Sequence, residues 1–354
     1  MSSDLHIDGV TKHFGDVQAV DDVSFTVEEG QFLTLLGPSG CGKTTTLRMI
    51  AGFETLTEGQ VSLGDRDVTD EEPYQRPTSM VFQSYALFPH KNVGENVGFG
   101  LKMREVPLEE RERRVSEMLE LIELPGIEDR SIDELSGGQQ QRIALARALI
   151  TEPEVLLLDE PLGALDLKLR KSMQVELKDL QEELGITFVY VTHDQEEALT
   201  MSDEIIILND GRIEQRGTPA EIYESPRTRF VAEFIGDTNL LDGTYVETET
   251  GARLESGGVD FHVERSEQVD DGASISVSVR PEKIVLDRAV DEGVTLDGTV
   301  EDVIYQGNVA KVHVRVDGIE LVSERQVMDS IDLPTPGSDC TISWKTEHAD
   351  VLIQ

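Results

Sequence analysis

Residues 37–44 read Gly-Pro-Ser-Gly-Cys-Gly-Lys-Thr and satisfy in full the G-x-x-x-x-G-K-[ST] pattern of a loop that surrounds nucleotide phosphates. Glycines let backbone N–H groups turn inward, and the helix that follows adds the positive end of its dipole. Lys43 can reach the β- and γ-phosphates, and the Thr44 hydroxyl can ligate Mg²⁺. The loop therefore predicts binding of a nucleoside triphosphate, with the contact residues Gly37, Pro38, Ser39, Gly40, Cys41, Gly42, Lys43, Thr44 and Thr45.

Residues 155–160 read Val-Leu-Leu-Leu-Asp-Glu, a short apolar run that ends in two carboxylates. A buried strand would deliver Asp159 rigidly to the carboxyl edge of a sheet, where ligands bind in open α/β folds. Asp159 would then hold Mg²⁺, and Glu160 suits a general base for an attacking water. Such a strand end is common by itself, but together with the phosphate loop it predicts nucleotide hydrolysis.

Residues 135–142, Leu-Ser-Gly-Gly-Gln-Gln-Gln-Arg, open a predicted helix that runs to about residue 150. Ser136 is a good N-cap, and that local role alone would explain it. A Ser-Gly-Gly helix start is also a second anion site, because it offers exposed N–H groups, a dipole and a hydroxyl. One nucleotide cannot easily use two such sites in one chain. Two chains that face each other head to tail could close both sites on two nucleotides.

These segments together resemble the ATP-binding subunits of ABC transporters, in which an L-S-G-G-Q segment lies between the phosphate loop and the Asp-Glu strand. Further landmarks of that family follow in the expected order. Phe14 lies 23 residues before Gly37, where the family places an aromatic ring that stacks on adenine. Gln83 stands at the position of the Q-loop, Asp166 in the D-loop, and His193 at the position of the switch histidine.

The resemblance covers residues 4–236 and implies that ATP and Mg²⁺ bind between the two copies of a homodimer. To the phosphate loop of one copy it adds the nucleotide contacts Phe14, Ser136, Gly137, Gly138, Gln139 and Asp166, with Ser136 and Gly138 coming from the partner copy. The implied metal ligands are Thr44, Gln83 and Asp159. The implied catalytic residues are Glu160, which activates water, His193, which positions the γ-phosphate, Gln83 and Lys43.

The elements that must position these residues alternate between strand and helix patterns. Residues 1–30 are predicted as short antiparallel strands, and buried strands are predicted at 31–36, 155–158, 187–191 and 204–208. Helices are predicted at 43–51, 107–124, 138–150 and 167–184. The alternation predicts an α/β domain over residues 1–236, with a largely parallel sheet, an antiparallel β subdomain and a helical subdomain.

The pattern changes near Gly236, where short alternating strands with Gly and Asp turns begin. Residues 237–354 are therefore predicted to form a separate, small all-β domain with OB-like barrel structure. The segments 230–236 and 278–282 resemble importer ATPases with a C-terminal TOBE domain, a group with maltose, iron, sulfate and polyamine types. Residues 303–307 and 343–345 look most like the polyamine type, so spermidine or putrescine is the expected solute.

The formal net charge is −39, from 70 acidic and 31 basic residues, and ten of the basic residues are lysines. Residues 237–354 hold 25 acidic and 9 basic residues, a net of −16, so the other −23 lies in residues 1–236. So negative a surface argues against nucleic acid as a partner. An ordinary well-solvated surface could look like this, but acidity with little lysine favours a halophile, because in molar salt a Debye length of about 3 Å screens self-repulsion.

The sequence has no apolar run long enough to span a bilayer and no signal-peptide pattern. Its cysteines, Cys41 and Cys340, are too far apart for a disulfide framework and fit a reducing compartment. The family resemblance then implies an ATPase at the cytoplasmic face of the cell membrane. Its partners would be two permease subunits and, indirectly, an extracellular solute-binding protein. Residues 85–103 are the expected permease contact, with Tyr85, Phe88 and Pro89 expected at the surface.

Three alternatives stay open at this point. The first is the same importer role for a sugar, iron, sulfate or another small solute. The second is a non-transport ABC ATPase that acts on DNA or ribosomes, which should carry a coiled-coil insertion, tandem cassettes or a basic face. The third is an efflux cassette, a class that usually lacks the β tail. The sequence shows none of the features of the second class and has the tail that the third lacks.

Overall fold

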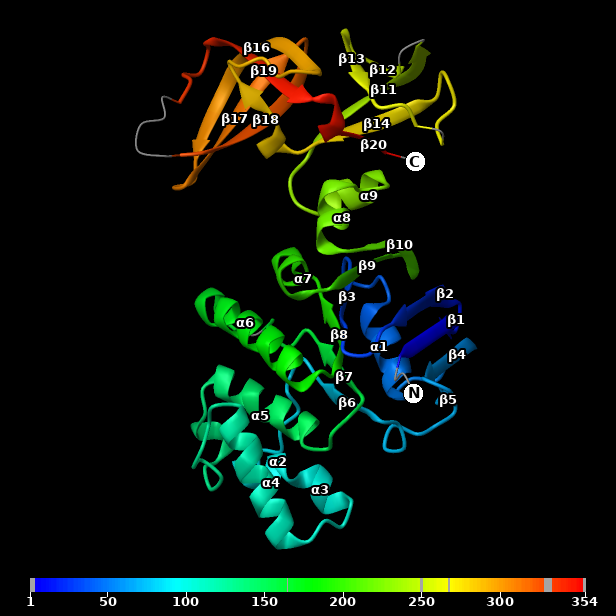
Figure 1. Ribbon diagram of the computed structural model, residues 1–354, viewed down its shortest axis with the longest axis vertical. Helices are drawn as coiled ribbons and strands as arrows, with labels where there is room; N and C mark the ends of the chain where they lie inside the picture. Colours follow the sequence, from blue (N-terminus) through cyan, green and yellow to red (C-terminus); the bar gives the residue numbers. More distant parts are fainter. Residues whose placement is uncertain (1–3, 164, 249–250, 267, 328–332, 353–354) are drawn as a thin grey trace. The chain divides into compact units, whose positions relative to one another are not determined.

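The computed structural model describes residues 4–163, 165–248, 251–266, 268–327 and 333–352. The chain divides into two compact units, Met1–Pro219 and Ala220–Gln354. The first unit combines sheets with helices, and the second is built mainly of strands (Figure 1). This is the predicted fold class, an α/β unit followed by a mostly β unit.

A six-stranded sheet forms the centre of the first unit, in the order β10-β9-β3-β8-β7-β6. The strands from β9 to β6 are parallel, whereas β10 runs antiparallel to β9. Parallel neighbours align their carboxyl ends, so the segments that follow β3, β7 and β8 emerge at one edge. The strands are β3 (Phe32–Leu36), β6 (Thr78–Val81), β7 (Val155–Asp159), β8 (Thr187–Thr192), β9 (Glu204–Asn209) and β10 (Arg212–Gly217).

Successive residues of β7 pack into different hydrophobic clusters, because side chains alternate across a strand. Val155 and Leu157 belong to a cluster with α1 (Lys43–Ala51), whereas Leu156 and Leu158 belong to one with α5 (Gly137–Leu149) and α6 (Leu167–Leu184). Both faces of the sheet are thus covered, which explains the unbroken apolar run in the sequence.

An antiparallel sheet of order β2-β1-β4-β5 also contributes to the cluster around α1. Its first two strands have 10 and 11 residues, so the predicted short strands are longer than expected but antiparallel as expected. The strands are β1 (Leu5–Phe14), β2 (Val17–Val27), β4 (Glu58–Leu63) and β5 (Arg66–Asp67).

The predicted helical subdomain lies between β6 and β7 in the sequence (Figure 1). Its helices bury a cluster that includes Val97, Leu101, Leu119 and Ile143. The helices are α2 (Val93–Val97), α3 (Phe99–Met103), α4 (Leu108–Leu121) and α5. Later in the chain, α6 joins β7 to β8, and α7 (Gln195–Met201) joins β8 to β9.

The second unit holds two five-stranded antiparallel sheets that share one hydrophobic cluster. Trp344 is fully buried in this cluster and meets Phe261 edge to face, with ring centroids 5.4 Å apart. One sheet is formed by β11 (Asn239–Thr248), β12 (Gly251–Ser256), β13 (Val259–Val263), β14 (Ser274–Val279) and β20 (Ala349–Leu352). The other is formed by β15 (Val285–Leu286), β16 (Gly293–Tyr305), β17 (Val309–Val316), β18 (Ile319–Gln326) and β19 (Asp339–Lys345).

Two short helices, α8 (Pro219–Glu224) and α9 (Arg229–Phe234), precede these sheets. The buried Arg280 guanidinium fastens them to the β strands by donating to the carbonyl oxygens of Tyr223 at 3.0 Å and Ala232 at 3.3 Å. The sequence-based boundary at residue 236 falls after these helices, whereas the division into compact units falls before nearly all of α8.

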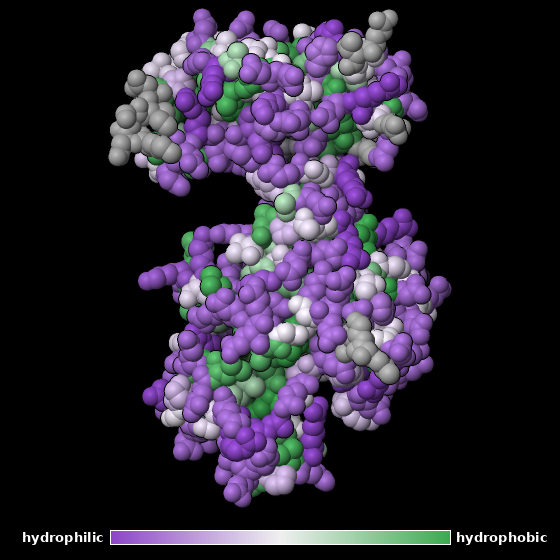
Figure 2. All heavy atoms as spheres, viewed as in Figure 1, coloured by the Kyte–Doolittle hydropathy of each residue, from purple (hydrophilic) through white to green (hydrophobic). Residues whose placement is uncertain are grey.

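The visible face of each unit is mostly hydrophilic (Figure 2). Cys41 and Cys340 are both free and buried. Within the described residues, no helix is both long enough and apolar enough to cross a membrane.

Candidate nucleotide site

The phosphate loop connects the end of β3 to the start of α1 at Lys43. Gly42 has a φ of 103°, and a Cβ there would lie 2.5 Å from the Ala19 carbonyl oxygen, so only glycine fits. The Lys43 side chain turns into the loop, is 5% exposed, and donates to the carbonyl oxygens of Gly37 at 2.7 Å and Pro38 at 2.8 Å. An anionic phosphate would be a stronger acceptor for this ammonium group than either carbonyl.

Thr44 and Asp159 meet directly. The Thr44 hydroxyl donates to Asp159 Oδ1 at 2.9 Å, which joins the first turn of α1 to the end of β7. Asp159 is 6% exposed, and burial raises the pKa of its carboxyl group. A carboxylate that is buried so deeply is stabilised by a cation. The hydroxyl and carboxylate oxygens are hard donors of the kind that Mg²⁺ prefers.

Two segments converge on the Glu160 carboxylate. The Gln83 side-chain amide donates to Oε2 at 2.9 Å, and His193 Nδ1 lies 3.1 Å from Oε1. The backbone N–H of Glu160 donates to the Val191 carbonyl oxygen at 2.9 Å, which links the turn to β8. Glu160 also has a φ of 45°, a strained conformation that costs a non-glycine residue of order 1 kcal/mol. The structure therefore places the side chains of Gln83 and His193 in contact with Glu160, the residue expected to activate water.

Ser136 begins α5 as an N-cap. Its hydroxyl accepts from the Gln139 N–H at 3.4 Å, and Gln139 Oε1 accepts from the Ser136 N–H at 3.0 Å. Gly138 packs so closely on α6 that a Cβ would lie 3.0 Å from Leu169 Cδ2. In the described part of the chain, the side-chain hydrogen bonds of Ser136 stay within its own helix. The segment that includes Ser136, Gly137, Gly138 and Gln139 thus presents its helix start without joining the phosphate loop of the same chain.

Phe14 and Asp166 take separate positions. The Phe14 ring is 47% exposed, with the Lys12 ammonium group 4.9 Å from its centroid, so one face is available to a ligand. The Asp166 carboxylate accepts from the N–H groups of Lys168 and Leu169, both at 3.1 Å, and caps α6. The sequence assigned these residues to the nucleotide, and their contacts within the chain are local.

The expectation that Tyr85 lies at the surface was wrong. Tyr85 is 7% exposed, and its hydroxyl donates to the Pro161 carbonyl oxygen at 3.2 Å. Phe88 is half-buried, and Pro89 is exposed as expected. The half-buried Arg147 guanidinium donates to the Tyr85 and Ala86 carbonyl oxygens, both at 2.7 Å. This role was not foreseen, because in the sequence Arg147 looks like any other polar residue of the predicted helix.

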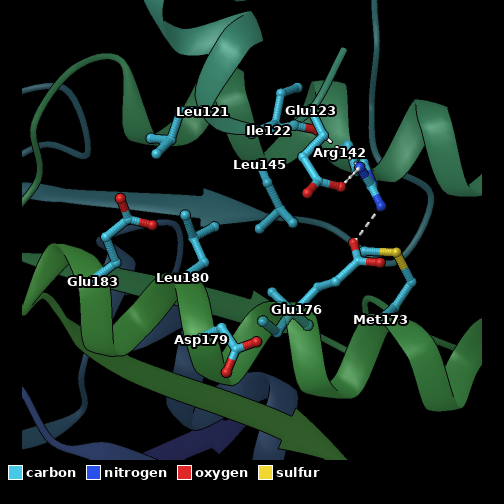
Figure 3. A pocket seen from close by; sticks show the side chains of 11 residues that line it. Leu121, Ile122, Glu123, Arg142, Leu145, Met173, Glu176, Asp179, Leu180 and Glu183 are labelled. Atoms are coloured by element: carbon cyan, nitrogen blue, oxygen red, sulfur yellow. Dashed lines mark hydrogen bonds and ion pairs between the residues drawn. The ribbon is translucent and has the colours of Figure 1, made fainter.

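A hollow of about 160 Å³ lies elsewhere in the first unit, among α4, α5 and α6 (Figure 3). Its floor is apolar, and Arg142 bridges Glu123 at 3.2 Å and Glu176 at 2.5 Å across it. None of the residues that line it belongs to the predicted site. The predicted site residues thus do not line this cavity.

Comparisons with known proteins agree with this geometry. The family described as ABC transporter matches residues 20–163, and the family described as TOBE domain matches residues 277–352. The chain is 51% identical to the spermidine/putrescine import ATP-binding protein PotA of Rubrobacter xylanophilus, over 98% of this chain and 93% of that protein. It belongs to the family of ABC transporter import ATP-binding proteins. A PotA of Thermobifida fusca is 53% identical, over 94% of this chain and 88% of that protein.

A solved structure is similar to the ATPase part of this family member. It is a dimeric, post-hydrolysis state of the ATP-binding cassette MJ0796 bound to ADP and Pi, with a TM-score of 0.55 and 35% identity. The match covers 61% of this chain and 98% of that one. The fold is therefore that of an ABC ATPase followed by a TOBE domain, and the chain binds and hydrolyses ATP as the ATPase subunit of an importer.

Proposed function

We propose that the chain drives import of spermidine and putrescine. A homodimer would act at the cytoplasmic face of the membrane beneath two permease subunits, which receive solute from an extracellular binding protein. The support for the solute is the near-full-length similarity to proteins named for spermidine and putrescine import. The support for the dimer is the dimeric cassette with 35% identity, together with Ser136, whose side-chain hydrogen bonds among the described residues stay within its own helix start.

The contact that supports the chemistry best is the convergence of Gln83 and His193 on Glu160. In the proposed mechanism, Glu160 takes a proton from the attacking water while that water's oxygen bonds to the γ-phosphorus and the bond to ADP breaks. His193 would hold the γ-phosphate, and Lys43 would exchange its loop carbonyls for phosphate oxygens. The two neighbours orient the carboxylate before the nucleotide arrives, so little reorganisation is needed.

Mg²⁺ fits the oxygen donors of this site. Thr44 and Asp159 are already in contact, and the amide oxygen of Gln83 is not used in its hydrogen bond to Glu160. Magnesium usually takes one or two carboxylates together with substrate phosphates and water, which suits a site with a single buried Asp. When bound, the ion would neutralise charge on the phosphate oxygens. We assign Thr44, Gln83 and Asp159 as its protein ligands.

Gln83 is also the proposed link to the permeases. It contacts Glu160 through its side chain, and it lies directly before the 85–103 segment, which we propose as the permease contact. With Tyr85 buried, Phe88 and Pro89 are the residues of the original surface set that remain accessible. Movement of this segment would therefore reach the carboxylate through a single side-chain hydrogen bond.

Glu160→Gln tests the assignment of the base. The amide keeps the shape of the side chain but cannot take a proton, so turnover should fall by about a thousandfold or more while ATP binding is preserved. Phosphate release and nucleotide binding by the full-length chain measure the two effects. Glu154→Gln, on the loop before β7, is the matched control and should leave both unchanged. Turnover near the wild-type rate in Glu160→Gln would refute the assignment.

Uptake by intact cells tests the proposed solute. Deleting the gene should reduce uptake of labelled spermidine or putrescine, and restoring the wild-type chain should recover it. Restoring the Glu160→Gln variant should not, because import needs hydrolysis. Unchanged polyamine uptake with lost uptake of a sugar, iron or an oxyanion would assign the chain to another solute of the same group.

A further inference from the structure

A buried carboxylate contacts Thr192, the residue that precedes His193, which is proposed to hold the γ-phosphate. Glu197, in the first turn of α7, is 2% exposed. Its Oε2 accepts from the Tyr190 hydroxyl at 2.7 Å and from the Thr192 hydroxyl at 2.6 Å. Burial raises the pKa of this carboxyl group, so its position in the core disfavours the charged form. Burying a carboxylate costs desolvation free energy, whereas an apolar side chain of similar volume would fill the same position without that cost.

The hydrogen bond between Thr192 and Glu197 lies next to the nucleotide site, because Thr192 directly precedes His193. The Thr192 hydroxyl, which donates to Glu197, also accepts from the Asp194 N–H at 3.0 Å. It therefore fixes the backbone on both sides of His193, the residue whose Nδ1 lies 3.1 Å from Glu160. The Asp194 carboxylate accepts from the N–H of Glu197 at 3.2 Å, which closes the turn onto α7.

Arg170 of α6 connects this turn to the D-loop segment. Its guanidinium donates to Asp194 Oδ2 at 3.2 Å and to the Leu165 carbonyl oxygen at 3.1 Å. Its Nε lies 4.0 Å from Glu197 Oε1, and among the described residues this buried nitrogen has no hydrogen-bond partner. Arg170 thus holds both the residue before Asp166 and the residue after His193, and its Nε faces Glu197 Oε1.

A second pair spans the same two helices and provides a contrast. Lys171 of α6 and Glu196 of α7 form an ion pair at 2.6 Å, but both side chains are more than half exposed. An exposed pair of this kind contributes little to stability. If Arg170 and Glu197 served only to join α6 to α7, the exposed pair would be enough for that. Arg170 and Glu197 differ from it because Glu197 is buried and because their hydrogen bonds lead to Thr192 and Leu165.

We propose that Glu197 and Arg170 are positioning residues for hydrolysis, which hold the His193 turn and the D-loop segment in one geometry. Glu197 acts through the Thr192 hydroxyl, and Arg170 acts through Asp194 and the Leu165 carbonyl. The two residues do not touch the nucleotide in this scheme. The inference rests on the proposed function, because it assumes that His193 and Glu160 act in ATP hydrolysis.

The test compares Glu197→Gln and Arg170→Met with the matched controls Glu196→Gln and Lys171→Met in the full-length chain. Loss of the Glu197 carboxylate or of the Arg170 guanidinium should lower kcat about tenfold and change KM for ATP less than about twofold, because geometry is lost while the phosphate loop is intact. The double variant should be no slower than the slower single variant, because both act on one turn. Both control variants should keep the wild-type kcat.

Variants of Thr192 test the same proposal if a Glu197 variant fails to fold. Thr192→Val removes the hydroxyl and should reproduce the tenfold loss, whereas Thr192→Ser keeps the hydroxyl and should restore the rate. A kcat for Thr192→Val equal to that of Thr192→Ser would overturn the proposal. So would a Glu197→Gln variant that matches Glu196→Gln. If Glu160→Gln itself still turned over, the proposed function would fail instead, whatever the Glu197 variants did.

Discussion

Glu160 illustrates how the site is built at the scale of single residues. Its side-chain partners, Gln83 and His193, follow different strands, and Gln83 is 77 residues away in sequence. Glu160 has its strained φ of 45° in the turn directly after β7. The residue types could be predicted from the sequence, because each belongs to a recognisable segment. Their contacts could not, because hydrogen bonds between segments depend on strand order and register.

Asp350 gives a pH prediction at the same scale. Burial raises its pKa to about 7, with Glu224 adding to the shift and Arg280 opposing it. The unfolded chain releases this proton near pH 3.8, so between these values the folded state binds more protons. The stabilisation is fully present below pH 3.8 and is lost as the pH rises through 7.

Asp350→Asn removes this dependence. At pH 8.5 the variant should be more stable than the wild type by on the order of 1 kcal/mol, after allowance for solvent screening. At pH 5.5, about midway between the two pKa values, the difference should be about half as large. Denaturant unfolding of the full-length chain at both pH values measures it. Asp339→Asn, at an exposed position on β19, is the control, and an equal gain in both variants would contradict the buried-carboxyl explanation.

At the scale of elements, the helices α1 and α6 have the bounds that the sequence predicts, Lys43–Ala51 and Leu167–Leu184. Both have strong local signals, a Gly-rich loop before α1 and an Asp N-cap before α6. The short helices α2 and α3 were not predicted, because five residues give little periodicity and their burial depends on α4 and α5. Tyr85 was predicted at the surface because its burial also depends on residues far away in the sequence. Its hydroxyl donates to Pro161, which follows β7.

The start of α5 gives a prediction at this scale. Ser136→Arg should abolish turnover without weakening ATP binding by the isolated subunit, because the Ser136 segment is proposed to contact the partner's nucleotide. Mixtures of this variant with the wild type should form partly active heterodimers. Ser131→Arg, at another helix-capping serine, is the control and should keep activity. Lost ATP binding by monomeric Ser136→Arg would contradict action across the dimer.

At the scale of the whole molecule, the fold does not explain the net charge of −39, because burial of apolar side chains and backbone hydrogen bonds determine the fold, whereas the charge lies on surface side chains. Arginine forms many of the ion pairs on the surface of both units, for example with Glu110 and Glu117 around Arg113. With 70 acidic and 31 basic residues, pairing each basic residue with one carboxylate would leave 39 carboxylates over. The similarities to known proteins lend no support to a halophilic origin, so salt adaptation stays a prediction from charge.

That prediction concerns both stability and rate. Self-repulsion among the carboxylates is large when the Debye length is about 10 Å, near 0.1 M salt, and small when it is about 3 Å, near 1 M. The same negative field repels the incoming ATP anion, which Lys43 attracts only at close range. Melting temperature and ATPase rate should therefore both rise steeply from tenths of molar to molar KCl, as circular dichroism melts and phosphate release would measure. A flat melting temperature between about 0.1 and 2 M KCl would refute salt adaptation, and the acidic surface would then point to a basic partner.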